Sequence, residues 1–133
     1  MSAFLTTWEP RLQGVLRVVI SYLFLQHATA KLFGFPHMAG FDNLQTWSLI
    51  WFAGMIELIG SALLLIGLWS RLVAFVMSGE MAFAYFIAHA PQGHVFSPLL
   101  NHGEAAVLYC FVFLFFAAAG PGSWSVDGAR GRA

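Results

Sequence analysis

Two glutamates, Glu57 and Glu80, lie near the middle of long apolar stretches of the sequence. A charged group at the centre of a membrane-spanning helix costs about 2.5–3.5 kcal/mol on insertion scales, so it faces the bundle interior, forms a pair or is neutralised. Carboxylates held in this way can bind a ligand or transfer protons. We predict that Glu57 and Glu80 face a shared polar hollow and act there as catalytic groups, with Glu104 relaying protons to the aqueous side.

The basic and titratable residues of the first apolar segment share one helical face. Arg17, Phe24 and Lys31 recur every seven residues, and His27 lies four residues before Lys31. Residues at these spacings line up on a helix, so we expect this face to point inward. Arg17, His27 and Lys31 are therefore predicted substrate-binding residues.

In the second apolar segment, Gly54, Glu57 and Ser61 form a stripe of small and polar residues. Such a stripe lets a neighbouring helix approach closely. Glu57 and Glu80 could also be purely structural, with one of them protonated or both paired with Arg17. Lys31 could simply extend its ammonium group to the lipid headgroups.

The third apolar segment adds Tyr85 and His89 as predicted substrate-binding residues, one helical turn apart. Glu80 lies about 180° away from His89 on an ideal helix, so the two would share a ligand only if the helix bent near Gly79.

The sequence "NHGE" contributes a further predicted ligand residue, His102, directly before Gly103 and Glu104. A structural alternative also fits this sequence. Asn101 could cap the following helix, with Glu104 reaching back in a capping-box-like arrangement.

Metal or haem binding is a less favoured alternative. The chain has five histidines, but no H-x-x-E-H or H-E-x-x-H pair, and a haem would need His27 and His89 to face each other. The single cysteine, Cys110, excludes a disulfide within the chain. Six basic and six acidic residues without a basic cluster argue against nucleic-acid binding.

The elements that would position these residues are membrane-spanning helices. The chain is 59% hydrophobic and only 9% charged, whereas soluble domains are about a quarter charged. Lipid-exposed backbone must satisfy its own hydrogen bonds, which favours helices over open strands. We predict an all-α, four-helix transmembrane bundle that forms one domain over residues 1–133, with spans at residues 12–33, 47–69, 72–89 and 104–119.

The flanking charges predict the orientation of these spans. Lys31 alone lies on one side, and the basic residues of the other side are Arg11, Arg17, Arg71, Arg130 and Arg132. Because basic residues are enriched on the cytoplasmic side, both termini should be cytoplasmic.

The ordered motifs of the chain resemble the DoxX family of small bacterial membrane proteins. They are an Arg in the first span followed by "QHATAKL", then "ELIGSALLLIGLWSRLVAF", "SGEMAFAYFIAHAP", "NHGEAAVLYCFVF" and "GPGSWSVD". The family more usually has Gly where this chain has Ala28, and "NGGE" where it has "NHGE". The resemblance implies a multi-pass protein of the bacterial inner membrane, often linked to quinone-dependent redox systems.

Our leading functional hypothesis is a membrane component of a quinone-linked oxidoreductase system. It would bind a quinone or a small redox substrate in the bundle and exchange with the quinone pool, working with a partner redox protein in the lipid bilayer. Whether this chain is itself catalytic and whether it forms a homo-oligomer are left open. The alternatives are a small proton-coupled transporter and a structural membrane anchor for a partner enzyme.

Overall fold

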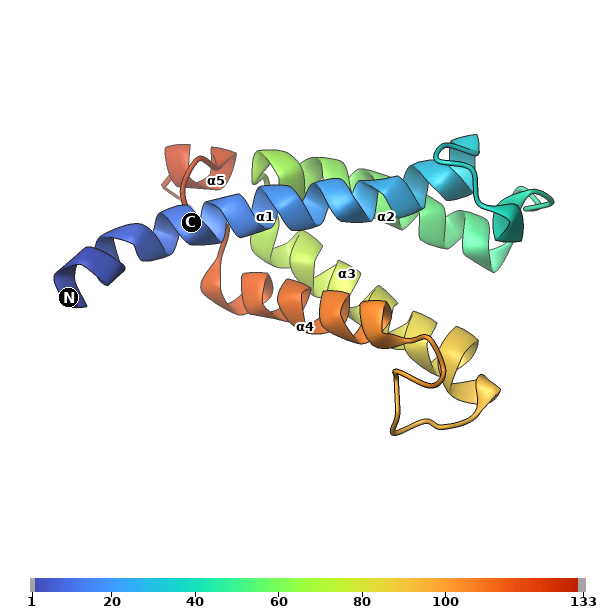
Figure 1. Ribbon diagram of the computed structural model, residues 1–133. Helices are drawn as coiled ribbons and strands as arrows, with labels where there is room; N and C mark the ends of the chain where they lie inside the picture. The colour runs from blue at the N-terminus through green and yellow to red at the C-terminus, as the bar shows by residue number, and fades with distance from the viewer. Residues whose placement is uncertain (1, 132–133) are drawn as a thin grey trace. The chain divides into compact units, whose positions relative to one another are not determined.

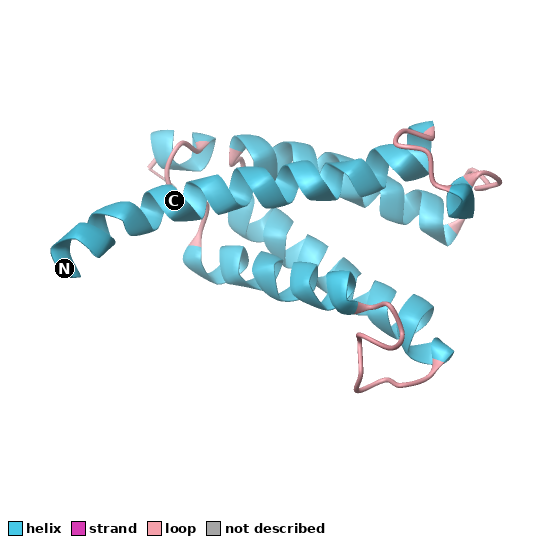
Figure 2. Ribbon diagram, viewed as in Figure 1, coloured by secondary structure: helices cyan, strands magenta, loops and turns pink. Residues whose placement is uncertain are grey.

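The computed structural model describes residues 2–131, and within that range it contains helices and loops but no strand (Figure 2). This confirms the all-α prediction. The long helices are α1 (Ser2–Phe33), α2 (Leu49–Ile66), α3 (Ser70–Ala84) and α4 (Glu104–Ala119). Four short elements accompany them: η1 (Ala39–Phe41), η2 (Tyr85–His89), η3 (Ala90–Gln92) and α5 (Val126–Ala129). The chain divides into two compact units, Met1–Ser70 with Pro121–Ala133 and Arg71–Gly120, and each is described by itself.

In the first unit, α1 and α2 run antiparallel along each other (Figure 1). The small residue Gly54 allows their close approach, because a Cβ atom there would lie only 3.2 Å from the side chain of Leu32. The predicted stripe on α2 is buried, including Glu57 and Ser61. The inward face predicted for α1 is confirmed as well, since Arg17 and Phe24 are both about 1% exposed.

The end of α2 is shaped by Gly67, which adopts a left-handed conformation with φ of 71°. The N–H of Leu68 then donates to the carbonyl of Leu63, a pattern that closes many helices at a glycine. A Cβ atom on Gly67 would lie 2.4 Å from the Cβ of Ser125. Only glycine therefore fits here against residues 121–131, the C-terminal segment.

In the second unit, α3 and α4 are antiparallel partners. Arg71 at the start of α3 donates to the carbonyl of Ala118 near the end of α4. Ser78, further along α3, donates from its hydroxyl to the carbonyl of Cys110 at 2.8 Å. After Ala84 the helix changes to a π-helical turn, Tyr85–His89. The helix thus departs from α geometry at Tyr85 rather than near Gly79.

Among the described residues, two helical stretches are long and apolar enough to cross a membrane, Leu49–Ile66 and Ser70–Gln92. The shorter apolar helix α4 begins and ends as the fourth predicted span does. Helix α1 has 32 residues and begins ten residues before the first predicted span. Large apolar side chains stay exposed along the long helices, for example Tyr22, Ile59, Phe75 and Leu108 at 54–66%. Apolar exposure of this extent is typical of surfaces that contact lipid or another protein.

Candidate functional site

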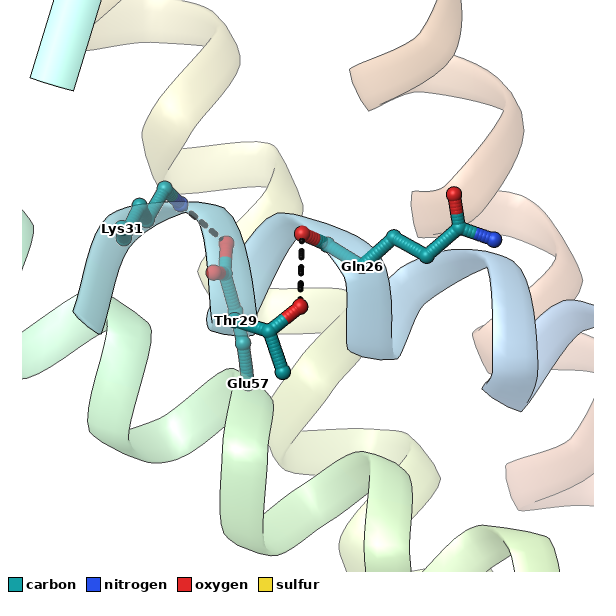
Figure 3. Close-up of polar contacts among 4 residues, drawn as sticks. All are labelled: Gln26, Thr29, Lys31 and Glu57. Carbon is teal, nitrogen blue, oxygen red and sulfur yellow. Dashed lines mark hydrogen bonds and ion pairs between the residues drawn. The ribbon is translucent and has the colours of Figure 1, made fainter. Parts of the chain in front are cut away.

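The centre of the candidate site is an ion pair between Lys31 of α1 and Glu57 of α2 (Figure 3). The two side chains are only 13% and 2% exposed. Nζ of Lys31 also lies 5.8 Å from the centroid of the Phe41 ring, a cation–π distance. Gln26 does not join the pair. Its backbone carbonyl accepts a hydrogen bond from the hydroxyl of Thr29, and its side-chain amide points away from Glu57 (Figure 3).

The ion pair uses only one of the two carboxylate oxygens of Glu57. Oε1 contacts Lys31, whereas buried Oε2 has no hydrogen-bond partner within residues 2–131. One turn further along α2, the buried hydroxyl of Ser61 also lacks a partner among the described residues. A carboxylate in an ion pair can only accept hydrogen bonds, and a serine hydroxyl can donate or accept. The site therefore offers a cation, an acceptor and a hydroxyl on two facing helices.

Arg17 lies at the other end of the α1–α2 pair and does not contact Glu57. Its Nη1 donates to the carbonyls of Pro121 at 2.6 Å and Ser123 at 3.2 Å, and its Nη2 donates to that of Trp124 at 2.8 Å. The structural alternative in which Arg17 pairs with Glu57 is therefore wrong. The lysine displaces it as partner because Lys31 faces Glu57 in this helix register. Nε of Arg17 is buried and has no hydrogen-bond partner in the described part of the chain.

Asp127 of α5 joins the C-terminal segment to the turn after α2. Its carboxylate accepts from the backbone N–H groups of Trp69 at 2.9 Å and Ser70 at 2.8 Å. Its own N–H donates to the carbonyl of Gly67. Burial raises the pKa of Asp127, but the hydrogen bonds from Ser70 and Trp69 and the charge of Arg130 outweigh burial, so the pKa falls below its ordinary value.

In the second unit, Tyr85, His89 and Asn101 form a hydrogen-bonded cluster. The Tyr85 hydroxyl donates to the carbonyl of Val95 at 2.7 Å and accepts from Nδ2 of Asn101 at 3.0 Å. Nδ1 of His89 lies 3.1 Å from the carbonyl oxygen of Asn101. The cluster ties the loop that follows η3 back to the π-helical turn, and π turns are frequent at functional sites.

Asn101 is not the N-cap that its position suggested. Helix α4 is capped by Gly103 without a side-chain hydrogen bond. The Oδ1 of Asn101 accepts from the N–H of Gly103 instead, at 3.0 Å. The side-chain amide of Asn101 thus bonds to Tyr85 and Gly103 and does not cap α4. The capping-box alternative is wrong.

The remaining predicted site residues differ in exposure. Both carboxylate oxygens of Glu80, on α3, are buried. His102 and Glu104 are exposed, and Glu104 lines a groove of about 570 Å³. The apolar walls of this groove include Leu99, Leu100, Val107 and Leu108. His27 is half-buried on α1, with its ring 5.9 Å from that of Phe24.

The structure therefore brings together Lys31 with Glu57 in one unit, and Tyr85 with His89 in the other. Sequence reasoning missed the linking role of Asn101 and the importance of Asp127. The sequence did hold a signal for Asp127: Ser125 is a preferred N-cap residue, so Ser125-Val126-Asp127 is typical of the start of a short helix. Within residues 2–131, no three His, Cys, Asp or Glu side chains cluster in a way that could hold a metal ion.

Comparisons with known proteins find one family model and a relative of similar length. The DoxX family model matches residues 12–90. An uncharacterised protein of Haemophilus influenzae is 42% identical over 125 residues, which cover 92% of this chain and 93% of that protein. No solved structure matches the chain.

Proposed function

This chain belongs to the DoxX family, and from that premise we propose that it is a membrane component of a quinone-linked oxidoreductase system. In this proposal, the buried Lys31–Glu57 pair contacts the head of a quinone-type ligand. The observation that carries the proposal is that the largely buried ion pair leaves one carboxylate oxygen of Glu57 without a partner among the described residues.

The residues around the pair suit a ligand with polar oxygens on a flat, conjugated ring. Lys31 provides a hydrogen-bond donor, Glu57 an acceptor and Ser61 a hydroxyl, and half-buried His27 lies on the same helix as Lys31. Ligand pockets typically combine a few such polar groups with apolar and aromatic walls. Phe24, buried on the same face of α1, is the aromatic neighbour of His27.

A purely structural ion pair would not need a free acceptor. Replacing a buried pair with apolar residues of similar volume is often neutral or stabilising, so buried pairs are weak evidence for a role in stability. An unsatisfied buried acceptor costs about 1–3 kcal/mol, and more if it is charged. A ligand that donates a hydrogen bond to Oε2 removes this cost, which gives the pair a functional rationale.

The other predicted groups enter the proposal within the second unit. Tyr85 and His89 form a candidate ligand-contacting cluster there, and buried Glu80 and exposed Glu104 are candidate proton-transfer groups. His102, exposed beside Glu104, is the outermost of these candidates.

For the setting of the protein, we propose a multi-pass arrangement in the bacterial inner membrane with both termini cytoplasmic. The electrons would come from a partner redox protein, since the chain has no redox cofactor motif of its own. The helix α4, with 16 residues, would span only where the bilayer is thin or the flanking loops are buried.

The test compares single and double variants of the full chain, purified in mild detergent. The single variant Glu57→Leu leaves Lys31 as an unpaired buried charge and should lower stability by about 3–5 kcal/mol. The double variant Lys31→Met with Glu57→Leu removes both charges and should recover most of that stability. Quinones that co-purify are quantified by mass spectrometry, and binding is measured by titration with a short-chain quinone.

The double variant separates function from structure. We expect it to be folded but to lose bound quinone and saturable quinone binding. If the double variant binds quinone as the wild type does, the Lys31–Glu57 site is not the ligand site. If the wild type binds no quinone at all, the proposal fails.

The structural-anchor hypothesis has a specific observation in its favour. Arg17 and Asp127 are engaged in holding the C-terminal segment, so two of the chain's twelve charged residues serve the architecture of the first unit. A wild-type protein that lacks quinone binding but co-purifies with a partner enzyme would support this second function.

A further inference from the structure

The chemistry of the two unpartnered atoms on α2 restricts which ligand group can bind between them. Oε2 of Glu57 and Oγ of Ser61 lie one helical turn apart in the same buried stripe. The residues are 1% and 0% exposed, and neither atom has a hydrogen-bond partner within residues 2–131.

An ionised carboxylate has no proton to donate. As long as Glu57 is ionised in its pair with Lys31, Oε2 can bind only a group that carries an O–H or N–H. A carbonyl oxygen placed against Oε2 would bring two acceptors together and leave both unsatisfied. The hydroxyl of Ser61, in contrast, can donate to an oxygen or accept from a donor.

A single hydroxyl group satisfies both atoms, because it donates its proton to Oε2 and accepts a hydrogen bond from Ser61. We propose that the Glu57–Ser61 pair recognises a ligand hydroxyl and therefore binds the reduced, quinol form of its ligand in preference to the oxidised, quinone form. This inference rests on the proposed function, since it concerns the redox form of the same ligand. It involves binding alone and no electron transfer.

The size of the preference follows from hydrogen-bond energetics. A hydrogen bond to a charged group contributes about 1.5–3 kcal/mol, which corresponds to a binding ratio of about tenfold or more. A neutral hydrogen bond from Ser61 contributes about fivefold to the affinity but not to the preference, since a hydroxyl donates to a hydroxyl or a carbonyl oxygen alike. Lys31 does not create this preference, because an ammonium group donates equally well to a hydroxyl or a carbonyl oxygen.

The experiment uses the full chain in detergent micelles under anaerobic conditions. One short-chain benzoquinone is titrated in its oxidised and in its reduced form, and both dissociation constants are measured by calorimetry. We expect the reduced form to bind at least about tenfold more tightly, and Ser61→Ala to weaken binding of the reduced form about fivefold.

Ser21→Ala is the matched control. Ser21 is also a fully buried serine, on α1, but its hydroxyl donates to the carbonyl of Arg17 in its own helix at 2.7 Å. This variant should bind the reduced form with wild-type affinity. Both variants place alanine, the residue with the highest helix propensity, within a helix, so both are expected to fold.

The outcomes distinguish this inference from the proposed function. If the wild type binds neither form, both fail. If it binds both forms equally and Ser61→Ala changes neither affinity, the two atoms contact only water, and the inference fails while the proposed function stands. An unchanged affinity of Ser61→Ala for the reduced form would also overturn the assignment to this pair.

Discussion

Replacing Arg17 with methionine tests whether its guanidinium group holds the C-terminal segment against α1. The substitution removes three hydrogen bonds to backbone carbonyls, of which those to Pro121 and Trp124 are short, at 2.6 and 2.8 Å. Methionine retains most of the apolar volume of the side chain, so the change isolates the polar contacts. The charge is removed with the donors, and no unpaired cation is left behind.

The expected magnitude follows from the two short bonds alone. Each hydrogen bond from a charged donor contributes at least about 1.5 kcal/mol, so opening of the segment should become easier by about 3 kcal/mol. That corresponds to a population of the open form about 150 times larger. Because Pro121 is fully buried, water cannot readily replace the hydrogen bond that its carbonyl loses.

Hydrogen exchange is the appropriate assay, because it reports local opening of single segments. The N–H groups of Ser123 and Asp127 donate to the carbonyls of Pro10 and Gly67, and both amides belong to the segment that Arg17 contacts. We expect their exchange in Arg17→Met to be about 150-fold faster than in the wild type.

Arg11→Met provides the control on the same helix. Arg11 is exposed and stacks on Trp8 at 5.2 Å, without a contact to the C-terminal segment among its described interactions. Surface substitutions of this kind usually change stability by less than about 0.5 kcal/mol. Equal exchange rates of Ser123 and Asp127 in the wild type and in Arg17→Met would refute the reasoning.

Two further predictions concern Asp127 and the glycines of the second unit. Because the folded-state pKa of Asp127 is lowered from 3.8, its contribution should be complete above that pH and disappear as the pH falls through the folded value. The wild type should thus unfold at a higher temperature than Asp127→Asn at pH 6, and the difference should shrink below about pH 4; a constant difference would contradict this. Gly103→Ala should destabilise the protein by about 1–3 kcal/mol, since its Cβ would lie 2.5 Å from Cε2 of Tyr85. Gly79→Ala meets no atom within 4 Å and should stabilise α3 by up to about 1 kcal/mol in thermal unfolding; equal effects of the two substitutions would contradict the packing argument.

The sequence predicted the helices well where local signals suffice. Helix α4 has the predicted bounds because Gly103 and Gly120 flank an uninterrupted apolar run. The π-helical turn at Tyr85–His89 could not be predicted, since it accompanies contacts with Val95 and Asn101 in a later loop. Such a turn depends on tertiary partners that periodicity does not reveal.

The site was predictable by face but not by partner. The spacings that place Lys31 and Glu57 on inward stripes are local properties of each helix. Which cation meets Glu57 depends on the register between α1 and α2, and a shift by a few turns would bring a different residue opposite it. Asp127 was overlooked because its partners, Trp69 and Ser70, lie 58 and 57 residues away in sequence.

The ion pair between the first two long helices also has a consequence for biogenesis. Inserted singly, α2 would carry Glu57 into hydrocarbon without its counterion, which at the centre of a helix costs about 2.5–3.5 kcal/mol. Lys31 lies in the last turn of α1, so it meets Glu57 only when both helices are in place. On the proposed topology, the two helices are thus best delivered to the bilayer as a preformed hairpin.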